Sequence, residues 1–353
     1  MASKRCSELG LKTLLVDRKL EIGAPVKDFE VISSGDLRNA GIALEDHWLA
    51  AKIRKVRVHF GKNETILVLD EDEIYSIEAD KFIKHLAALS SQAGTDIMIR
   101  TEAVAPIIES GVVSGIALRN GSKDTVEKCG MVIYAGGYDS QFLKQFPDLV
   151  MPHSTLLAKI LQERIIGNLE NLTEAVIDIS DDMTSVTAII PKGGRTANAA
   201  IIYRPHDIDP RSEIQHYLSA DLKLERYGSI QEVRADIFRR QRPVRIGVPG
   251  LILAGDAAGI SNHLWPFGIG KSMLSGKAAA DAAFEASGKE GGEIAAEYMN
   301  ILERISGSGR TLRIMEELER MDADMLSDRI SSLGSEKHLK GQLDPEGLLA
   351  VFL

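Results

Sequence analysis

The sequence predicts an α/β fold in which a parallel-sheet part alternates along the chain with an antiparallel-sheet part and is followed by C-terminal helices. Three observations predict it. The chain opens on a helix and a strand, residues 2–9 and 11–16, of the kind found in a βαβ unit. From about residue 150 to 236, short strands alternate with turns. Near residue 250, a buried strand runs into an alanine-rich helix, as in a parallel sheet covered by helices.

Composition bounds the classes of protein to which the chain can belong. Its 353 residues are 44% hydrophobic and 26% charged, which is typical of a folded protein with about two domains. A formal net charge of -9 argues against sequence-independent binding to the phosphates of nucleic acids. Two cysteines, Cys6 and Cys129, form no disulfide framework, and the eight histidines show no metal-ligand spacing, so no metal site is predicted. No apolar run is long enough for a membrane span, and a cytoplasmic protein is expected.

The first elements form a βαβ unit without its first strand. Ala2 to Leu9 is the end of a helix, Gly10 its C-cap, and Leu11 to Val16 a buried strand that ends at Asp17. An acidic residue at this place binds a ribose hydroxyl in dinucleotide-binding units, and a surface carboxylate is the alternative. The glycine fingerprint of such a unit would fall before Met1. We hypothesise that Met1 is an internal methionine of a longer reading frame, or that the gene has lost its 5′ end.

A hairpin and a helix come next. Apolar and basic residues alternate over 52–60, a turn follows at 61–63, and the alternation continues to 68. This pattern predicts a β-hairpin with one buried and one solvent-exposed face. Asp80 is predicted to cap a helix that Gly94 ends. Short strands over 96–100, 103–109, 112–119 and 130–135 then predict a β-meander and a buried strand.

The second half contains the antiparallel part and the second parallel strand. Strands are predicted over 186–190 and 196–203, around a turn at Pro191 to Gly194. Gly250 to Ala254 is a buried strand of the parallel type, and Ser272 to Ala286 is an alanine-rich helix that can approach it closely. From Glu293 onward the pattern indicates charged amphipathic helices.

The segment after residue 249 carries the clearest chemical signal. Its strand ends in Gly255, which allows close backbone approach, and in Asp256, whose carboxylate can accept hydrogen bonds from hydroxyls. The residues from Gly268 to Gly270 precede a helix start whose amides favour negative charge. A glycine, a carboxylate and a helix start in this arrangement suit a ligand that contains a polyol chain and a ring that becomes anionic on reduction. A strand-to-helix turn with an Asp N-cap is the alternative interpretation.

At this point the sequence resembles the geranylgeranyl reductase family of FAD-dependent oxidoreductases, within the p-hydroxybenzoate hydroxylase-like flavoproteins. The resemblance covers nearly the whole chain. It implies that Asp256 binds the ribityl chain of FAD, that Asp17 binds the adenosine ribose, and that the amides of Gly268 to Gly270 face the flavin ring. It implies further cofactor contacts at Arg18, Lys27, Gly136, Gly255 and Ile269.

Several departures from the family pattern touch the cavity. Where the family reads Pro-x-Arg-Cys-Gly-Glu, residues 25–30 read PVKDFE, so that Asp28 replaces a thiol, and Gly136 stands where an Asp is common. His263 and Trp265 lie in the loop expected to face the flavin, and together with Asp28 they are the catalytic candidates. A packing role is the alternative for Trp265, and Lys27 and Glu30 are either pocket residues or solvated loop charges.

The resemblance implies a FAD/NAD(P)-binding Rossmann-like domain interleaved with an antiparallel-sheet substrate domain, plus C-terminal helices. The expected ranges are 1–40, 75–150 and 238–290 for the FAD-binding domain, 41–74 and 151–237 for the substrate domain, and 291–353 for the helical region.

The function that this resemblance implies is reduction of carbon–carbon double bonds in an isoprenoid lipid by hydride from reduced FAD. NAD(P)H or a ferredoxin would supply the electrons, and a lipid substrate implies peripheral contact with a membrane. The arginine-rich stretch from Arg234 to Arg245 would suit a diphosphate or an anionic headgroup. Two alternatives stay open: a flavoprotein dehydrogenase that passes electrons to a quinone-like acceptor, and a non-catalytic, decayed paralogue.

Overall fold

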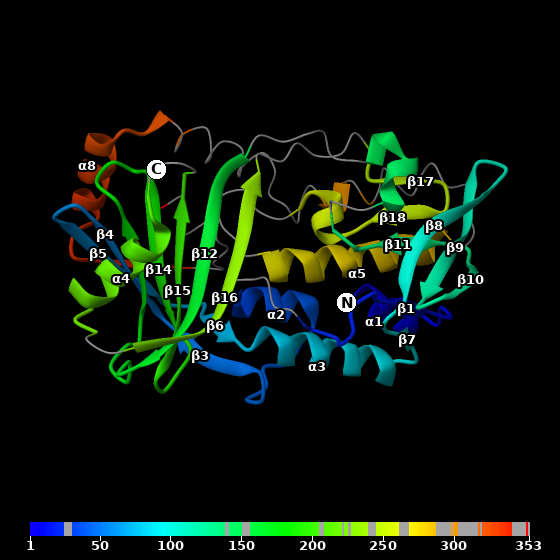
Figure 1. Cartoon of the computed structure of the whole chain (residues 1–353), viewed down its shortest axis with the longest axis horizontal. Coiled ribbons are helices and arrows are strands. Elements are labelled where there is room, and N and C mark those ends of the chain that lie inside the picture. The colour runs from blue at the N-terminus through cyan, green and yellow to red at the C-terminus, as the bar shows by residue number, and fades with distance from the viewer. Residues whose placement is uncertain are drawn as a thin grey trace.

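The structure is a computed structural model, and it places a large sheet at one end, long helices across the middle and a β-meander at the other end (Figure 1). The residues that it describes are 1–24, 30–137, 141–149, 156–204, 208–220, 222–224, 227–238, 245–260, 268–286, 298, 300–302, 317, 320–340 and 351.

Two small sheets contain the predicted parallel strands. Strand β1 (Leu14–Val16) pairs in parallel with β7 (Asp96–Met98), and β11 (Val132–Tyr134) pairs in parallel with β18 (Leu251–Leu253). Strand β17 (Gly247–Val248) adds an antiparallel edge beside β18. These pairings confirm the α/β class.

Strand β1 is less buried than its sequence predicts. Leu14 is 37% exposed, and the other two residues of β1 are only half-buried. Among the described strands, β1 pairs only with β7, so its other edge has no hydrogen-bonded neighbouring strand. A strand inside a parallel sheet is normally covered on both sides. The expectation of a fully buried strand at this place is therefore wrong for the described chain.

Four helices lie beside these strands. They are α1 (Ala2–Glu8), α2 (Ser34–Ala40), α3 (Ala79–Gln92) and α5 (Gly268–Ala286). Helix α1 packs against α3 and α5. Its C-cap is Leu9 instead of the predicted Gly10, which follows it with φ of +82°. Close approach of α1 and α5 depends on Gly276, since a Cβ there would lie 3.1 Å from the Ala2 nitrogen.

The start of α3 differs from the prediction. The N-cap is Glu78, and Asp80 lies in the first turn instead of capping the helix. The helix ends before Gly94, whose φ is +102°, as the sequence predicts. A carboxylate in the first turn still interacts favourably with the helix dipole, which is why Asp80 suits either position.

The meander differs from the prediction in two strands: the predicted strand over 96–100 lies outside it, as β7, and a strand over 123–128 was not predicted. Strands β8 (Glu102–Glu109), β9 (Val112–Asn120) and β10 (Lys123–Lys128) form a three-stranded antiparallel sheet. Their two connections place Ser110, Gly111 and Gly121 at positive φ, as tight hairpin turns require. After β11, two short turns, η1 (Phe142–Gln145) and η2 (Pro147–Leu149), bury Phe142, Leu143 and Leu149 against β18.

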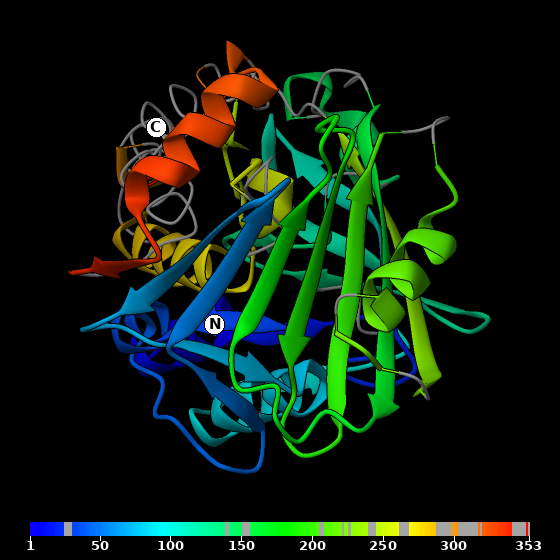
Figure 2. The ribbon, with the colours of Figure 1, turned by 90° about the vertical axis from the view of Figure 1, so that its left-hand side faces the viewer.

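The large sheet has eight strands among the described residues, and Figure 2 shows it face on. Its order is β16 (Tyr227–Phe238), β12 (Leu156–Gly167), β15 (Thr196–Tyr203), β14 (Ser185–Pro191), β13 (Ala175–Ile179), β4 (Lys55–Phe60), β5 (Asn63–Leu69) and β19 (Glu336–Leu339). The predicted hairpin is β4–β5, and in β4 fully buried residues alternate with exposed or half-buried ones, as expected.

Two pairings in this sheet were not predicted. Strand β13 joins β4 in parallel, whereas the sequence predicts an antiparallel part throughout. Strand β19 pairs in parallel with β5, in a stretch where the sequence indicates helices. Helix α4 (Pro210–Ala220), which lies beside β15, was also missed, whereas α8 (Ala323–Leu333) falls in the expected helical region.

The fifth sheet of the described residues has three strands. Strands β2 (Val31–Ser33) and β3 (Leu49–Ile53) both pair with β6 (Ile74–Ile77), and all of them are antiparallel. The expected domain boundaries divide these strands between two domains, and that division stays a prediction.

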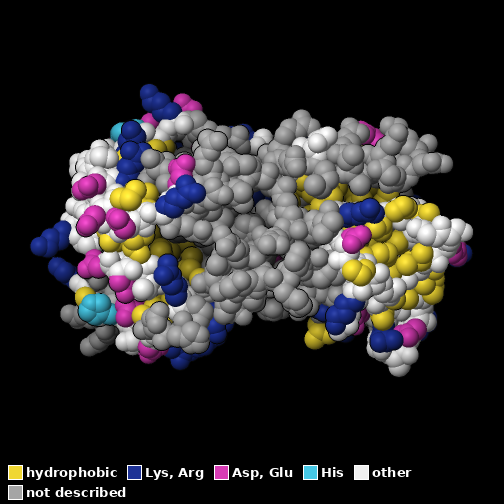
Figure 3. Space-filling view, turned by 90° about the horizontal axis from the view of Figure 1, so that it is seen from above, with side chains coloured by type: hydrophobic (Ala, Val, Ile, Leu, Met, Phe, Trp, Pro, Cys, Tyr) yellow, Lys and Arg dark blue, Asp and Glu magenta, His cyan; other side chains and the backbone are white. Residues whose placement is uncertain are grey.

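The surface differs between the two ends. In Figure 3, acidic and basic side chains mix over the end with the large sheet, and hydrophobic side chains gather on the opposite end. The meander itself exposes Ile108, Val112 and Val126. Among the described residues, none of the helices has both the length and the apolar character needed to cross a membrane.

Candidate functional site

A glycine turn at the end of β18 forms the centre of the candidate site. Gly255 has φ of +62° and starts a short helical turn, η3 (Gly255–Ala258), which ends at Gly259 with φ of +68°. The Gly255 N–H donates to Ser275 Oγ at 2.9 Å, and Ser275 is fully buried in α5. Because both glycines adopt a left-handed backbone, the chain can turn sharply from the sheet toward α5.

A buried tyrosine holds this turn from the other side. Tyr298 Oη donates to the Leu253 carbonyl oxygen at 2.7 Å, and the tyrosine has no exposed surface. Burial raises the pKa of Tyr298, so that it remains a hydrogen-bond donor at any ordinary pH. Asp256 follows in the first turn of η3 and is half-buried.

The start of α5 contacts α2 through a residue that sequence reasoning missed. Helix α5 begins at Gly268, one turn before the predicted Ser272. A Cβ on Gly270 would lie 2.1 Å from Asp36 Oδ2, so the absence of a side chain lets that carboxylate lie against the helix start. The N–H of Asp36 in turn donates to Ser33 Oγ, the N-cap of α2, at 3.0 Å.

Three other predicted cofactor residues, Asp17, Arg18 and Gly136, lie just after the carboxyl ends of β1 and β11. Asp17 is half-buried, and its Oδ1 accepts a hydrogen bond from the Lys19 N–H at 2.9 Å. Arg18 is exposed, 3.9 Å from a Glu102 oxygen. A Cβ at Gly136 would lie 2.5 Å from Tyr134 Oη, so a side chain at this position would require the Tyr134 ring to move.

A buried ionic cluster ties β2 and β6 to the large sheet. Glu30 is 2% exposed, and its Oε2 accepts from Arg164 Nη2 at 2.5 Å, from Lys192 Nζ at 2.9 Å and from Asn198 Nδ2 at 2.9 Å. Glu78 completes the cluster, with Arg164 Nη1 at 2.9 Å and Lys192 Nζ at 3.6 Å. The interpretation of Glu30 as a solvated loop charge is therefore wrong.

Electrostatics keep Glu30 ionised in this setting. Burial opposes its ionisation, but the Lys192 ammonium and the hydrogen bonds from Arg164 and Asn198 outweigh that effect and lower the pKa of Glu30. The Glu30 backbone has φ of +59°, an uncommon conformation for a residue with a side chain. The cluster compensates for this strain by holding the start of β2 in place.

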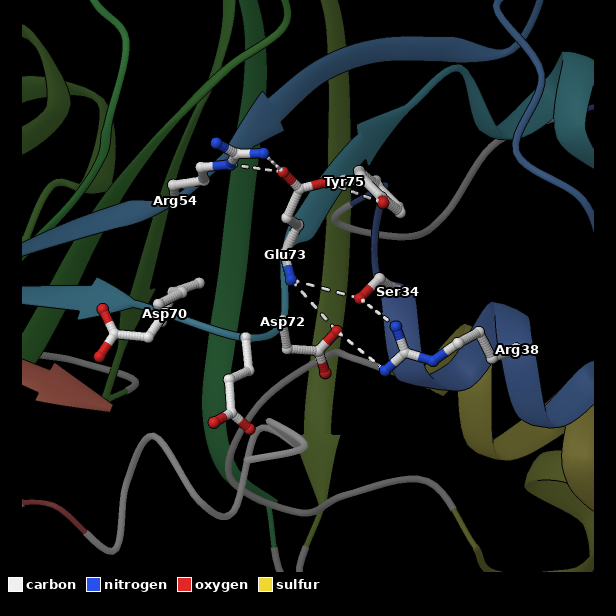
Figure 4. Close-up of a pocket in the computed structure, with 9 residues that line it drawn as sticks. Ser34, Arg38, Arg54, Asp70, Asp72, Glu73 and Tyr75 are labelled. Carbon is white, nitrogen blue, oxygen red and sulfur yellow. Dashed lines mark hydrogen bonds and ion pairs between the residues drawn. The ribbon is translucent and has the colours of Figure 1, made fainter. Parts of the chain in front are cut away.

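A polar pocket of about 410 Å³ opens beside α2 (Figure 4). Glu73 accepts hydrogen bonds there from Arg54 and from Tyr75 Oη, the latter at 2.9 Å. Arg38 lies 3.6 Å from an oxygen of Asp72, which is 1% exposed. The lining residues are Ser34, Arg38, Arg54, Leu69, Asp70, Glu71, Asp72, Glu73 and Tyr75.

The charged lining of this pocket makes it unsuitable for binding an apolar chain. Burial, the hydrogen bond to Glu73 and the Glu73 charge raise the pKa of Tyr75 to about 12, so its hydroxyl stays protonated. Four acidic residues line the pocket against two arginines, and only Leu69 is aliphatic. Because burying charged groups under hydrocarbon is costly, this pocket does not suit an apolar chain.

The structure brings some of the predicted residues together. Gly255 lies near α5, since a Cβ there would be 3.6 Å from Ser272 Oγ, and Asp256 follows directly. Gly268, Ile269 and Gly270 form the first turn of that helix. Lys27, Asp28, His263 and Trp265 lie outside the described residues, so their predicted roles stay predictions.

Comparison with known proteins identifies sequence relatives. No protein-family model matches the chain. Digeranylgeranylglycerophospholipid reductase from Thermoplasma acidophilum is 28% identical over 306 residues, which cover 81% of this chain and 75% of that protein. The protein of the same name from Picrophilus torridus is 26% identical over 316 residues, 86% of this chain and 79% of that one. These relatives confirm the resemblance to the geranylgeranyl reductase family.

Solved structures share the fold. A geranylgeranyl bacteriochlorophyll reductase-like protein from Thermoplasma acidophilum matches with a TM-score of 0.88 and 26% identity, over 99% of this chain and 91% of that one. A flavin-dependent brominase matches with a TM-score of 0.74 and 15% identity, over 99% of this chain and 89% of that one. The predicted flavoprotein-type α/β fold is therefore confirmed, and at 15% identity the brominase bears on the fold alone.

Proposed function

We propose that this chain is an FAD-dependent oxidoreductase that reduces carbon–carbon double bonds of an isoprenoid lipid. The observation that supports this most strongly is the correspondence of nearly the whole backbone with a geranylgeranyl reductase-like structure. The glycine turn at the end of β18 lies inside that shared backbone. Fold alone would not carry a function, but here the sequence relatives are themselves reductases.

The described residues fit the flavin half of an FAD molecule. The turn at Gly255 carries Asp256, whose carboxylate would accept hydrogen bonds from the ribityl hydroxyls. The first turn of α5 has backbone amides without helical acceptors, and its positive dipole end favours an electron-rich ring edge. Gly268, Ile269 and Gly270 would supply those amides. Asp17, at the end of β1, would bind the adenosine ribose, with Arg18 and Gly136 at neighbouring strand ends.

When bound and reduced, the flavin supplies the hydride for the double bond. The chain has to hold the ring, admit the lipid and deliver a proton to the second carbon. Ser275 and Tyr298 fix the turn that carries Asp256, and the ionic cluster around Glu30 fixes the loop end that follows Asp28. We assign substrate contact or proton delivery to Asp28, His263 and Trp265.

The electron source and the lipid's origin complete the proposal. NAD(P)H or a ferredoxin would reduce the flavin, which needs two electrons for each double bond that is saturated. An isoprenoid lipid resides in a membrane, so the enzyme would approach it by peripheral contact. The quinone-linked dehydrogenase is the alternative that the test below separates.

An anaerobic reoxidation experiment tests the function. The protein is loaded with FAD, reduced, and mixed with a geranylgeranylated glycerophospholipid or with a soluble quinone. We expect the oxidised-flavin absorbance near about 450 nm to return with the lipid. If only the quinone restores the absorbance, the reductase assignment is wrong. If the protein retains no FAD at all, both enzymatic functions are excluded.

A further inference from the structure

We propose that Glu45, His47 and His85 form a binding site for a divalent transition metal ion such as Zn²⁺. The three side chains come from the turn before β3 and from the middle of α3. Their ligand atoms all lie within 4.8 Å of one another. The sequence predicts no metal site, because His47 and His85 are far apart along the chain and only the fold brings them together.

The distances suit tetrahedral coordination. Glu45 Oε2 lies 3.1 Å from His47 Nδ1, and Glu45 Oε1 lies 3.7 Å from His85 Nε2. Two ligands bonded at 2.0–2.1 Å to one tetrahedral ion are separated by about 3.3 Å. Small side-chain rotations would therefore let all three ligands contact one ion, and water would fill the fourth position.

The chemistry of the ligands selects the class of metal. Two imidazoles and one carboxylate are typical of zinc and similar ions, whereas Mg²⁺ and Ca²⁺ prefer oxygen ligands alone. Among the described residues, the ion-pair partners of Glu45 are these two histidines and no lysine or arginine. The carboxylate charge at this place is therefore available to a cation from solution.

One of the three ligands, His85, is already held in place by packing. The His85 side chain is only 11% exposed, and its ring contacts His47 at 5.1 Å between centroids and Trp48 at 6.3 Å. Trp48 is fully buried, and its ring packs edge-on against that of Phe82, which like His85 belongs to α3, with 4.8 Å between the ring centroids. A rigid ligand loses little entropy on binding, so only Glu45 and His47 have to be ordered by the ion. The metal would then clamp the turn to α3.

Zinc titration by calorimetry tests the site, on tag-free, full-length protein. We expect wild-type protein to bind one Zn²⁺ at this site and to gain thermal stability on binding. The His47→Ala change should weaken Zn²⁺ binding by at least about 10-fold, because loss of a direct ligand costs no less than loss of an outer-shell partner. His47 is 52% exposed, so this variant should fold normally.

The matched control is His338→Ala. His338 lies 2.7 Å from an oxygen of Asp70 and 3.0 Å from one of Glu336, a histidine with carboxylates but without a second imidazole. Its removal should leave Zn²⁺ affinity unchanged. The proposal is overturned if wild-type protein binds no stoichiometric zinc, or if His338→Ala loses as much affinity as His47→Ala. A thiolate band in the Co²⁺ spectrum would equally overturn it, because it would assign the ion to a cysteine.

Discussion

Replacing Glu30 by glutamine should destabilise the protein strongly. The change removes the negative charge at the centre of the buried cluster and leaves Lys192, whose side chain is fully buried, with the more distant Glu78 as its remaining anion. Removing one partner from a buried ion pair typically costs about 3–5 kcal/mol. The glutamine oxygen can still accept one of the hydrogen bonds, so we expect a loss near the lower limit, about 3 kcal/mol.

The reverse change should cost less. In Lys192→Met, the Glu30 carboxylate keeps Arg164, Asn198 and the Ala79 N–H, so its hydrogen bonding stays nearly complete. We expect a loss of about 1–2 kcal/mol, the usual cost of a hydrogen bond and its packing. The double variant should be less destabilised than the sum of the two single variants, because the stranded lysine is gone.

Urea unfolding at pH 7, followed by circular dichroism, measures these differences. The control is Glu109→Gln, which removes an exposed partner of Lys128 and should produce no measurable change. The reasoning is refuted if Glu30→Gln unfolds at the wild-type urea concentration, or if Lys192→Met is the more destabilised variant.

The Glu30 cluster should also make the stability of the fold depend on pH in the acid range. The pKa of Glu30 is lowered from 4.5 in the folded protein, so its ionisation stabilises the fold at pH values above that ordinary value. This contribution is lost as the pH falls through the folded pKa. Wild-type protein should therefore lose more stability between pH 5 and acid pH than Glu30→Gln does, and parallel pH profiles for the two would contradict the assignment.

Three further changes test the candidate site. Gly270→Ala should displace Asp36 and cost about 1–3 kcal/mol in thermal unfolding, whereas Gly130→Ala, which meets nothing within 4 Å, should not, and equal midpoints would contradict the close contact. Asp256→Ala should lower the FAD retained after gel filtration, and an unchanged flavin-to-protein ratio would contradict its role. Tyr298→Phe should lower stability by about 1–2 kcal/mol through loss of the hydrogen bond to β18, which urea unfolding would register or disprove.

Segments with a strong local pattern could be predicted from the sequence. The alternation over 52–68 predicts the β4–β5 hairpin, and the apolar run at 196–203 coincides with β15. The glycine turn after β18 could be found because strand, glycine and carboxylate follow one another directly in the chain. Local order of this kind survives in any tertiary setting that buries the apolar face.

What the sequence could not predict depends on contacts between distant residues. Strand β19 reads EKHL, which has no strand period, and it forms only because the free edge of β5 lies beside it. The Glu30 cluster joins positions 30, 78, 164, 192 and 198, and none of them signals its partners. One clue existed: Lys192 directly follows a strand that is almost wholly buried, where a charge needs a partner.

The most direct test of the proposed chemistry is the mass of the lipid after a single turnover. The FAD-loaded protein is reduced without oxygen, mixed with less than one equivalent of digeranylgeranyl glycerophospholipid, and the lipid is extracted for mass spectrometry. We predict a gain of two hydrogen atoms in the lipid for each flavin that is oxidised. Lipid recovered at its original mass, whether the flavin stays reduced or is oxidised, would contradict the account.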